Sequence, residues 1–251
     1  MGKTIKIVML VLCIHLTSCS KTDDTHICNG DCNQFKGRVY TEDNVGIPNV
    51  EITVSFSSSY NPWGTSYTRI IAKSTTDSEG NYVIEGYIKD KEFSSGHFFL
   101  TIDENKIENS ISTNFLKPSD IYQGDYEDNN IHFIPYLTNR TQIITTDYKI
   151  PYKTNLTVNL NDFIPTTSND LFGVGNAIRY GFENEYRFLT KQANNQGYGF
   201  SNGTNATFLV PAVYGENHLK VYKFKNGLQE YIDDIIMVTN PNTSPPLNYS
   251  F

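Results

Sequence analysis

The stretch GIPNVEITVSF, residues 46–56, decides the fold class of this chain. Every second residue from Val50 to Phe56 is apolar, and the residues between them are polar. A period of two is typical of a β-strand that buries one face in a core and leaves the other in solvent. The stretch therefore predicts a half-buried strand, and an all-β fold if its surroundings repeat the pattern.

The sequence on both sides does repeat it. In IAKSTTDSEGNYVIEGYI (71–88), Asp77–Gly80 reads as a turn, after which Tyr82 and Ile84 should point inward and Val83 and Glu85 outward. HFFLTI (97–102) is a further expected strand. Thr, Tyr and Phe are abundant and Ala and Leu sparse, which favours strands over helices.

Three of these segments together resemble a known family. KGRV (36–39), GIPNVEITV (46–54) and TTDSEGNY (75–82) are similar to the strand and hairpin motifs of the carboxypeptidase regulatory-like domain. The resemblance implies a transthyretin-like antiparallel β-sandwich over residues 34–137. Such domains carry no catalysis themselves and usually accompany a peptidase, a transporter or an adhesive partner.

The second half has the same texture but resembles no family that we identify. About seven short strands are expected over residues 138–240, and Asn226–Gly227 is a hairpin signal between two of them. This pattern predicts a second, immunoglobulin-like sandwich. Residues 241–251 are expected to be a C-terminal tail, disordered or loosely docked.

The N-terminus reads as a leader. Two lysines, Lys3 and Lys6, flank the start of an apolar run that is too short to span a bilayer. LTSC (16–19) resembles the lipobox of bacterial lipoproteins, which implies cleavage after residue 18 and lipidation of Cys19. Residues 1–18 would then be a signal peptide and 19–33 a tether, with the membrane as a partner through acyl chains. The alternative is an ordinary secretory signal with a chance cysteine.

The residues after Cys19 bear on location. Ser20 is not an aspartate, which resembles the default for outer-membrane lipoproteins. SKTDD (20–24) also resembles the acidic export signal of Bacteroidetes surface lipoproteins. We therefore expect a lipid-anchored outer-membrane protein that faces the exterior. A merely solvated tether is the alternative.

Two cysteines remain for the folded part. Outside the cytoplasm, Cys28 and Cys32 are expected to form a disulfide around the turn Asn29–Asp31. A metal site of His26 with both cysteines is the alternative, but it lacks an evident fourth ligand. An acidic cluster near 120–128 could suit calcium, but its spacing does not match an EF-hand loop and favours a solvated loop. No metal or cofactor is expected.

Aromatic residues in two loops are the candidate ligand contacts. The insertion at 57–69 holds the single tryptophan, Trp63, between Tyr60 and Tyr67. The loop near residue 200 adds Tyr198 and Phe200. Exposed aromatic rings can stack on sugars or anchor protein contacts. The alternative for Trp63 is that it folds back over an open end of the sandwich.

The expected function is non-catalytic binding or adhesion. A net charge of −7 argues against nucleic acid, which needs a basic surface. No histidine lies in a nucleophile or metalloprotease motif, so we expect no enzyme. The partner would be a glycan or an envelope or host protein. The rivals are a structural subunit joined by strand addition and a hydrolase with a dispersed acid pair.

Overall fold

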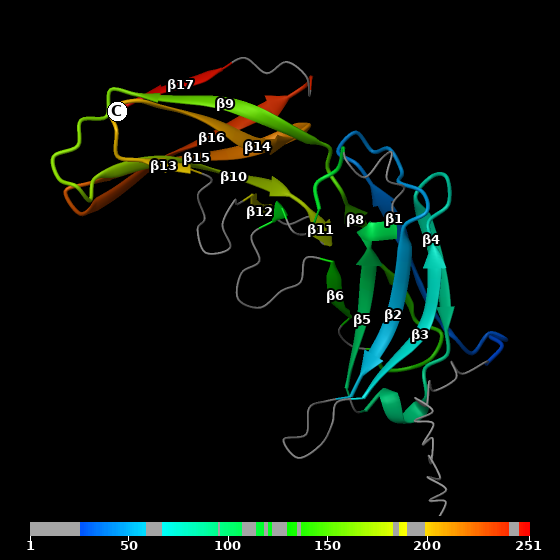
Figure 1. Cartoon of the computed structure of the whole chain (residues 1–251). Coiled ribbons are helices and arrows are strands. Elements are labelled where there is room, and N and C mark those ends of the chain that lie inside the picture. Colours follow the sequence, from blue (N-terminus) through cyan, green and yellow to red (C-terminus); the bar gives the residue numbers. More distant parts are fainter. Residues whose placement is uncertain are drawn as a thin grey trace, which may run out of the picture.

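The computed structural model describes residues 26–58, 67–94, 96–106, 114–117, 120–121, 130–134, 137–182, 186–189, 199–240 and 246–251. Over these residues the chain is almost entirely β-strand and forms two β-sandwiches (Figure 1), which confirms the predicted all-β class. The described helices are two single turns, η1 (Asp90–Glu92) and η2 (Glu104–Lys106). Within the described ranges no helix has the length and apolar character needed to cross a membrane.

The first sandwich packs two sheets around one core. One sheet has the order β3 (Thr68–Thr75), β2 (Glu51–Ser57), β5 (His97–Asp103) and β6 (Ile131–Ile134). The other has the order β11 (Gly181–Phe182), β8 (Tyr148–Lys149), β1 (Asn33–Tyr40) and β4 (Asn81–Gly86), with β7 (Ile143–Thr145) also on β1. Alternate residues of β2 and β4 are buried, as their period of two predicts.

The second sandwich is built in the same way. Its larger sheet has the order β12 (Tyr186–Leu189), β10 (Leu171–Arg179), β15 (Gly215–Lys225) and β16 (Leu228–Val238), with β13 (Gly199–Ser201) also on β10. Its smaller sheet has the order β14 (Ala206–Val213), β9 (Lys153–Asn161) and β17 (Leu247–Ser250). The predicted hairpin at Asn226–Gly227 joins β15 to β16, and both turn residues have positive φ, as a two-residue hairpin of this kind requires.

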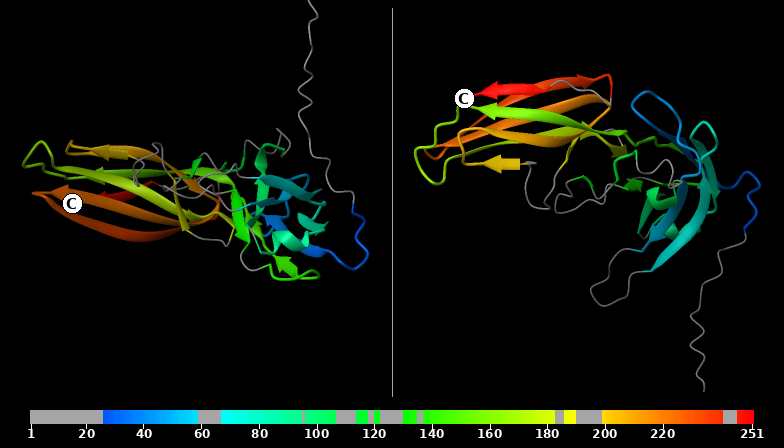
Figure 2. Two further views of the ribbon diagram at one scale, coloured as in Figure 1. Left: turned by 90° about the horizontal axis from the view of Figure 1, so that it is seen from below. Right: turned by 45° about the horizontal axis from the view of Figure 1, so that its top comes forward.

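The two sandwiches have separate cores, but residues from the second half of the chain also pack in the core of the first sandwich. Residues from beyond position 137, the expected end of the first domain, enter the first core: Tyr148, Ile150, Ile178, Tyr180, Phe182, Leu189 and Val213. The second core is formed mainly by β9, β10, β14 and β15. Figures 1 and 2 show an elongated molecule with the first described residues at one end and the β15–β16 hairpin at the other.

Part of the segment expected to be a loose tail is ordered. β17 pairs parallel with β9, and Leu247, Tyr249 and Phe251 pack against the second core. These three residues alternate along the chain, so the strand period is present there. The sequence alone did not reveal the strand, because the segment is short and polar and follows two prolines.

Candidate functional site

A row of aromatic side chains crosses the outer face of the larger sheet of the second sandwich. Phe200 on β13 lies directly opposite Gly173 on β10, which lies opposite Tyr222 on β15, which lies opposite Tyr231 on β16. Residues directly opposite one another share a face of the sheet. We call Phe200, Tyr222, Phe224 and Tyr231 the aromatic row.

The rings of this row are in mutual contact range. The ring centroid of Tyr222 lies 6.3 Å from that of Phe200, 6.2 Å from that of Phe224 and 6.4 Å from that of Tyr231. These separations are within the range of favourable aromatic pairs. Tyr222 is buried at the centre, and burial raises the pKa of its phenol. Phe200 and Tyr231 flank it and are exposed.

Gly173 makes room for the row. A Cβ atom at this position would lie 2.3 Å from the ring of Phe200 and 2.5 Å from the carbonyl oxygen of Gly199. The missing side chain therefore lets the ring of Phe200 lie across β10. The next residue on this face of β10 is Gly175, opposite Lys220. The ring of Phe200 thus takes the place that a side chain at Gly173 would fill on this face.

Charged groups border the row on one side. The ammonium group of Lys220 lies 5.1 Å from the ring centroid of Tyr231 and 5.7 Å from that of Phe188. It also lies 3.7 Å from the carboxylate of Asp233. Donors and acceptors for hydrogen bonds therefore stand beside the exposed rings of Phe200 and Tyr231.

A polar network lies further along the same face, toward the first sandwich. Glu216 accepts a hydrogen bond from the hydroxyl of Tyr186 and pairs with His218 at 3.0 Å and with Arg179 at 3.8 Å. The hydrogen bond from Tyr186, with that from His218, holds the pKa of Glu216 below its usual range. An ionised carboxylate with its partners in place suits a structural clamp between β10, β12 and β15.

The first sandwich carries a smaller aromatic group. His97, Phe99 and Phe133 lie on the outer face of β5 and β6, with the Phe99 and Phe133 centroids 5.9 Å apart. His97 lies opposite Ser57, the last residue of β2. β2 ends at this point, and residues 59–66 of the expected contact loop lie outside the described residues.

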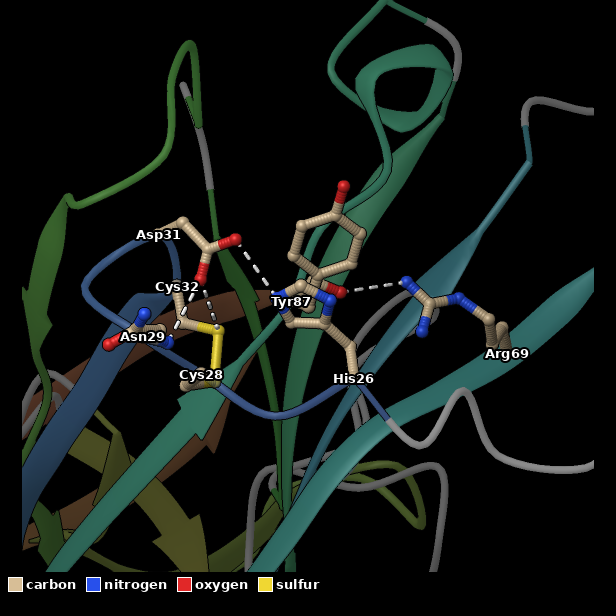
Figure 3. Close-up of a disulfide and its surroundings, with 7 residues drawn as sticks. All are labelled: His26, Cys28, Asn29, Asp31, Cys32, Arg69 and Tyr87. Carbon is tan, nitrogen blue, oxygen red and sulfur yellow. Dashed lines mark hydrogen bonds and ion pairs between the residues drawn. A yellow bond between two sulfur atoms is a disulfide. The ribbon is translucent and has the colours of Figure 1, made fainter.

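The N-terminal segment is held against the first sandwich by a compact set of contacts (Figure 3). A disulfide joins Cys28 to Cys32, the pair expected to form one. The ring of His26 stacks on Tyr87 with centroids 3.8 Å apart, and His26 pairs with Asp31 at 2.9 Å. His26, Asp31 and Cys32 lie near one another, but a disulfide sulfur is not the thiolate that metal binding needs.

Tyr87 is itself fixed from the other side. The guanidinium of Arg140 lies 4.7 Å from its ring centroid and donates a hydrogen bond of 2.9 Å to its hydroxyl. Arg69, buried in an ion pair with Glu92, donates a hydrogen bond of 3.2 Å to the Tyr87 carbonyl. The ring on which His26 stacks is therefore held in place by contacts of Tyr87 with Arg140 and Arg69.

The structure describes only some of the residues that the sequence suggested as ligand contacts. Cys19, Tyr60, Trp63 and Tyr198 lie outside the described residues, as does most of the acidic cluster. Tyr67 is half-buried and packs against the first core. Phe200 lies in the aromatic row, and its role in binding stays a prediction.

Sequence reasoning missed the partners of Phe200. The sequence identifies Tyr222, Phe224 and Tyr231 only as strand residues. No local pattern shows which distant strands pair, so none shows which side chains lie on the same face of a sheet. The spacing Tyr222–Phe224 beside the Asn226–Gly227 hairpin, with Tyr231 beyond it, was the available signal. A hairpin with a two-residue loop fixes its own register.

Comparisons with known proteins give little. No family model matches the chain, and no curated protein matches it. Among solved structures, it is similar to the Bacillus anthracis TIE protein at 11% identity and a TM-score of 0.30, over 88% of this chain and 34% of that one. It is also similar to the Lactobacillus rhamnosus GG shaft pilin SpaA at 11% identity and a TM-score of 0.30, over 86% of this chain and 96% of that one.

A third similar structure is the Porphyromonas gingivalis tip fimbrial protein Mfa3, at 10% identity and a TM-score of 0.26, over 80% of this chain and 81% of that one. The chain spans about a third of the length of the TIE protein structure. Scores and identities this low carry no conclusion on function. The description of two β-sandwiches rests on the strands of this chain alone.

Proposed function

We propose that this chain is a non-catalytic, lipid-anchored binding module of the bacterial envelope that holds a glycan on the aromatic row. The observation that carries the proposal is the row itself, because exposed Phe200 and Tyr231 lie on either side of Tyr222 on the outer face of the sheet. A large contiguous apolar patch on a protein surface usually marks a place where something binds, whereas single exposed apolar residues are ordinary.

The chemistry of the row suits a sugar better than a charged ligand. Its rings offer flat apolar faces, and the hydroxyl of Tyr231, the ammonium of Lys220 and the carboxylate of Asp233 stand beside them. A ligand with C–H groups on its faces and hydroxyls at its edges meets both kinds of group. Lys220 and Asp233 lie 3.7 Å apart, so this pair adds no net charge beside the rings.

The carboxyl groups whose pKa is shifted do not have the property that a general acid needs. Hydrolysis of a glycosidic bond by an acid pair needs one carboxyl group with a raised pKa. Among the described carboxyl groups, each one with a shifted pKa is shifted downward: Asp31, Glu51, Asp77, Asp170 and Glu216. Such groups accept hydrogen bonds well and are poor general acids.

A glycan array followed by calorimetry tests the binding proposal. The protein to use is the mature chain with Cys19→Ala, compared with the same chain carrying Phe200→Ala and Tyr231→Ala. We expect the double variant to lose binding at least tenfold with its folding intact. Leu209→Ala is the matched control, because Leu209 is an exposed apolar residue of the same sandwich on the opposite sheet. Equal binding by the double variant would refute the proposal.

The anchor is tested separately. Cys19→Ser should leave the protein unlipidated and move it from the membrane fraction to the soluble fraction of the cells. Protease treatment of intact cells, with a periplasmic protein as lysis control, then tests whether the domains face the exterior. Digestion of the protein with survival of the control supports surface exposure, and protection of both argues for a periplasmic location.

A second function, assembly with another polypeptide, is favoured by a different observation. The edge strand β16 exposes apolar side chains on both of its faces. A glycan resting on the aromatic row would cover only one of those faces.

A further inference from the structure

The last strand of the larger sheet in the second sandwich is unusually apolar for an edge. β16 ends the order β12-β10-β15-β16, and among the described residues no strand pairs with its outer edge. Five of its eleven residues are large, apolar and exposed: Leu228 (69%), Tyr231 (55%), Ile232 (47%), Ile235 (61%) and Met237 (61%). Natural edge strands are usually short or charged, because a long apolar edge attracts another strand.

These residues occupy both faces of the strand. Tyr231 and Ile235 lie opposite Tyr222 and His218, on the outer face of the sheet. Ile232 lies opposite the core residue Val221 and so belongs to the inner face, as does Leu228 four residues earlier. A ligand lying on one face would leave the other in water.

The inner face is open because the opposing sheet is short at this edge. β17 has four residues against the eleven of β16. It reaches β16 through the hydroxyl of Tyr249, which donates a hydrogen bond of 2.8 Å to Asp234. Ile236 and Val238 pack into the core, whereas Leu228 and Ile232 lie on the hairpin side of this contact and remain exposed.

The charges of β16 indicate what kind of strand fits. Its sequence LQEYIDDIIMV holds three acids and no lysine or arginine. Two copies would bring together two strands that each hold three acids and no basic residue, and antiparallel pairing about Asp233 or about Ile232 would place acid directly opposite acid. Like charges directly opposite one another are destabilising. A strand with lysine or arginine at those positions would meet opposite charges instead.

We propose that the free edge of β16 takes up an extended strand of another polypeptide, apolar on both faces and carrying lysine or arginine. Strand addition of this kind gains backbone hydrogen bonds along the edge, and alternate side chains cover the two faces. Leu228 and Ile232 would be covered on one side, and Ile235 and Met237 on the other. The proposal concerns an edge rather than the aromatic row, so it stands or falls independently of glycan binding.

The probe is a fluorescent peptide, Val-Lys-Ile-Val-Lys-Val-Ile-Lys-Thr, titrated with the mature chain carrying Cys19→Ala and followed by anisotropy. We expect saturable binding that weakens at least tenfold with either Ile232→Lys or Ile235→Lys, because each lies on a different face. Val83→Lys is the control, since Val83 is exposed on β4, which also ends its sheet. Circular dichroism checks that the variants fold.

Altered peptides sharpen the test. Replacing the lysines by glutamates should abolish binding. Two further peptides carry N-methyl groups on alternate backbone amides, one peptide along one edge and the other along the opposite edge. Because only one edge of the peptide pairs with β16, one of these two peptides should lose binding and the other should keep it. The proposal is overturned if the lysine peptide shows no saturable binding at millimolar concentration, or if both N-methylated peptides bind as well as the parent. It is also overturned if only Ile235→Lys weakens binding, or if sedimentation shows dimers of the protein that Ile232→Lys dissolves.

Discussion

At the scale of single residues, the aromatic row depends on a missing side chain. Gly173→Ala should force the ring of Phe200 away from β10, because the new Cβ would fall 2.3 Å from that ring and 2.5 Å from a backbone oxygen. Overpacking of this kind costs about 1–3 kcal/mol, measurable by urea denaturation. Gly203→Ala is the control, with its nearest neighbour at 3.4 Å. Equal stability of the two variants would show that the row does not need the glycine.

A second residue, Asp170, fastens the far tip of the second sandwich. Its buried carboxylate accepts hydrogen bonds from the backbone and hydroxyl groups of Thr166 and Thr167 and from the backbone of Asn226 in the β15–β16 turn. These bonds, that from the Thr166 backbone first, hold the pKa of Asp170 well below its ordinary value. Asp170 therefore joins two loops that are distant in sequence.

The depressed pKa fixes the sign of a pH effect. The stability contributed by Asp170 is present in full above the unfolded-state pKa, near 3.8, and is lost as pH falls through the lower folded-state pKa. Asp170→Asn should thus lower the melting temperature by several degrees at neutral pH, and the difference from wild type should shrink only in strong acid. Glu85→Gln, at an exposed site on β4, is the control and should change neither the melting temperature nor its dependence on pH. A difference independent of pH would mean that the carboxylate charge is not the cause.

At the scale of elements, strands were easier to predict than their partners. The period of two in β2 and β4, and the Asn226–Gly227 turn, are local properties, and each is found as predicted. The parallel pairing of β7 and β8 with β1 joins residues more than a hundred positions apart. No local pattern encodes such a pairing. For the same reason Phe200 could be singled out but not the neighbours that make it part of a surface.

The N-terminal segment is an element whose position rests on one ring. Tyr87→Ala removes the surface on which His26 stacks and which Arg140 supports. A stacked pair contributes about 0.5–1.5 kcal/mol, so amide hydrogen exchange over residues 26–32 should quicken by up to about tenfold. Tyr87→Phe keeps the ring and should keep most of the protection. Unchanged exchange in Tyr87→Ala would show that the disulfide loop holds itself in place.

At the scale of the whole molecule, the placement of the two ends gives the fold a direction. Residues 26–32 dock on the first sandwich through His26 and Tyr87, and the aromatic row and β16 lie on the second sandwich (Figure 2). With a lipid on Cys19, the first sandwich would stand nearer the membrane and the second would project from it. The two sandwiches are joined by Tyr180, Phe182 and Val213, which pack in the first core.

The shared core also predicts how the chain can be divided. A fragment ending at residue 137 loses β7, β8 and β11, which leaves one edge of β1 without its partners, and it loses the fully buried Tyr148, Ile150 and Tyr180. We expect residues 26–137 to show no cooperative unfolding in urea, whereas the mature chain does. Tyr148→Ala in the intact chain tests the same point without truncation. Its ring packs 4.6 Å from Phe182 and 5.9 Å from Tyr180 between centroids, and its loss should cost about 3–5 kcal/mol. A stable, cooperative fragment 26–137 would instead mean that the first sandwich folds alone and that the junction is a contact between finished domains.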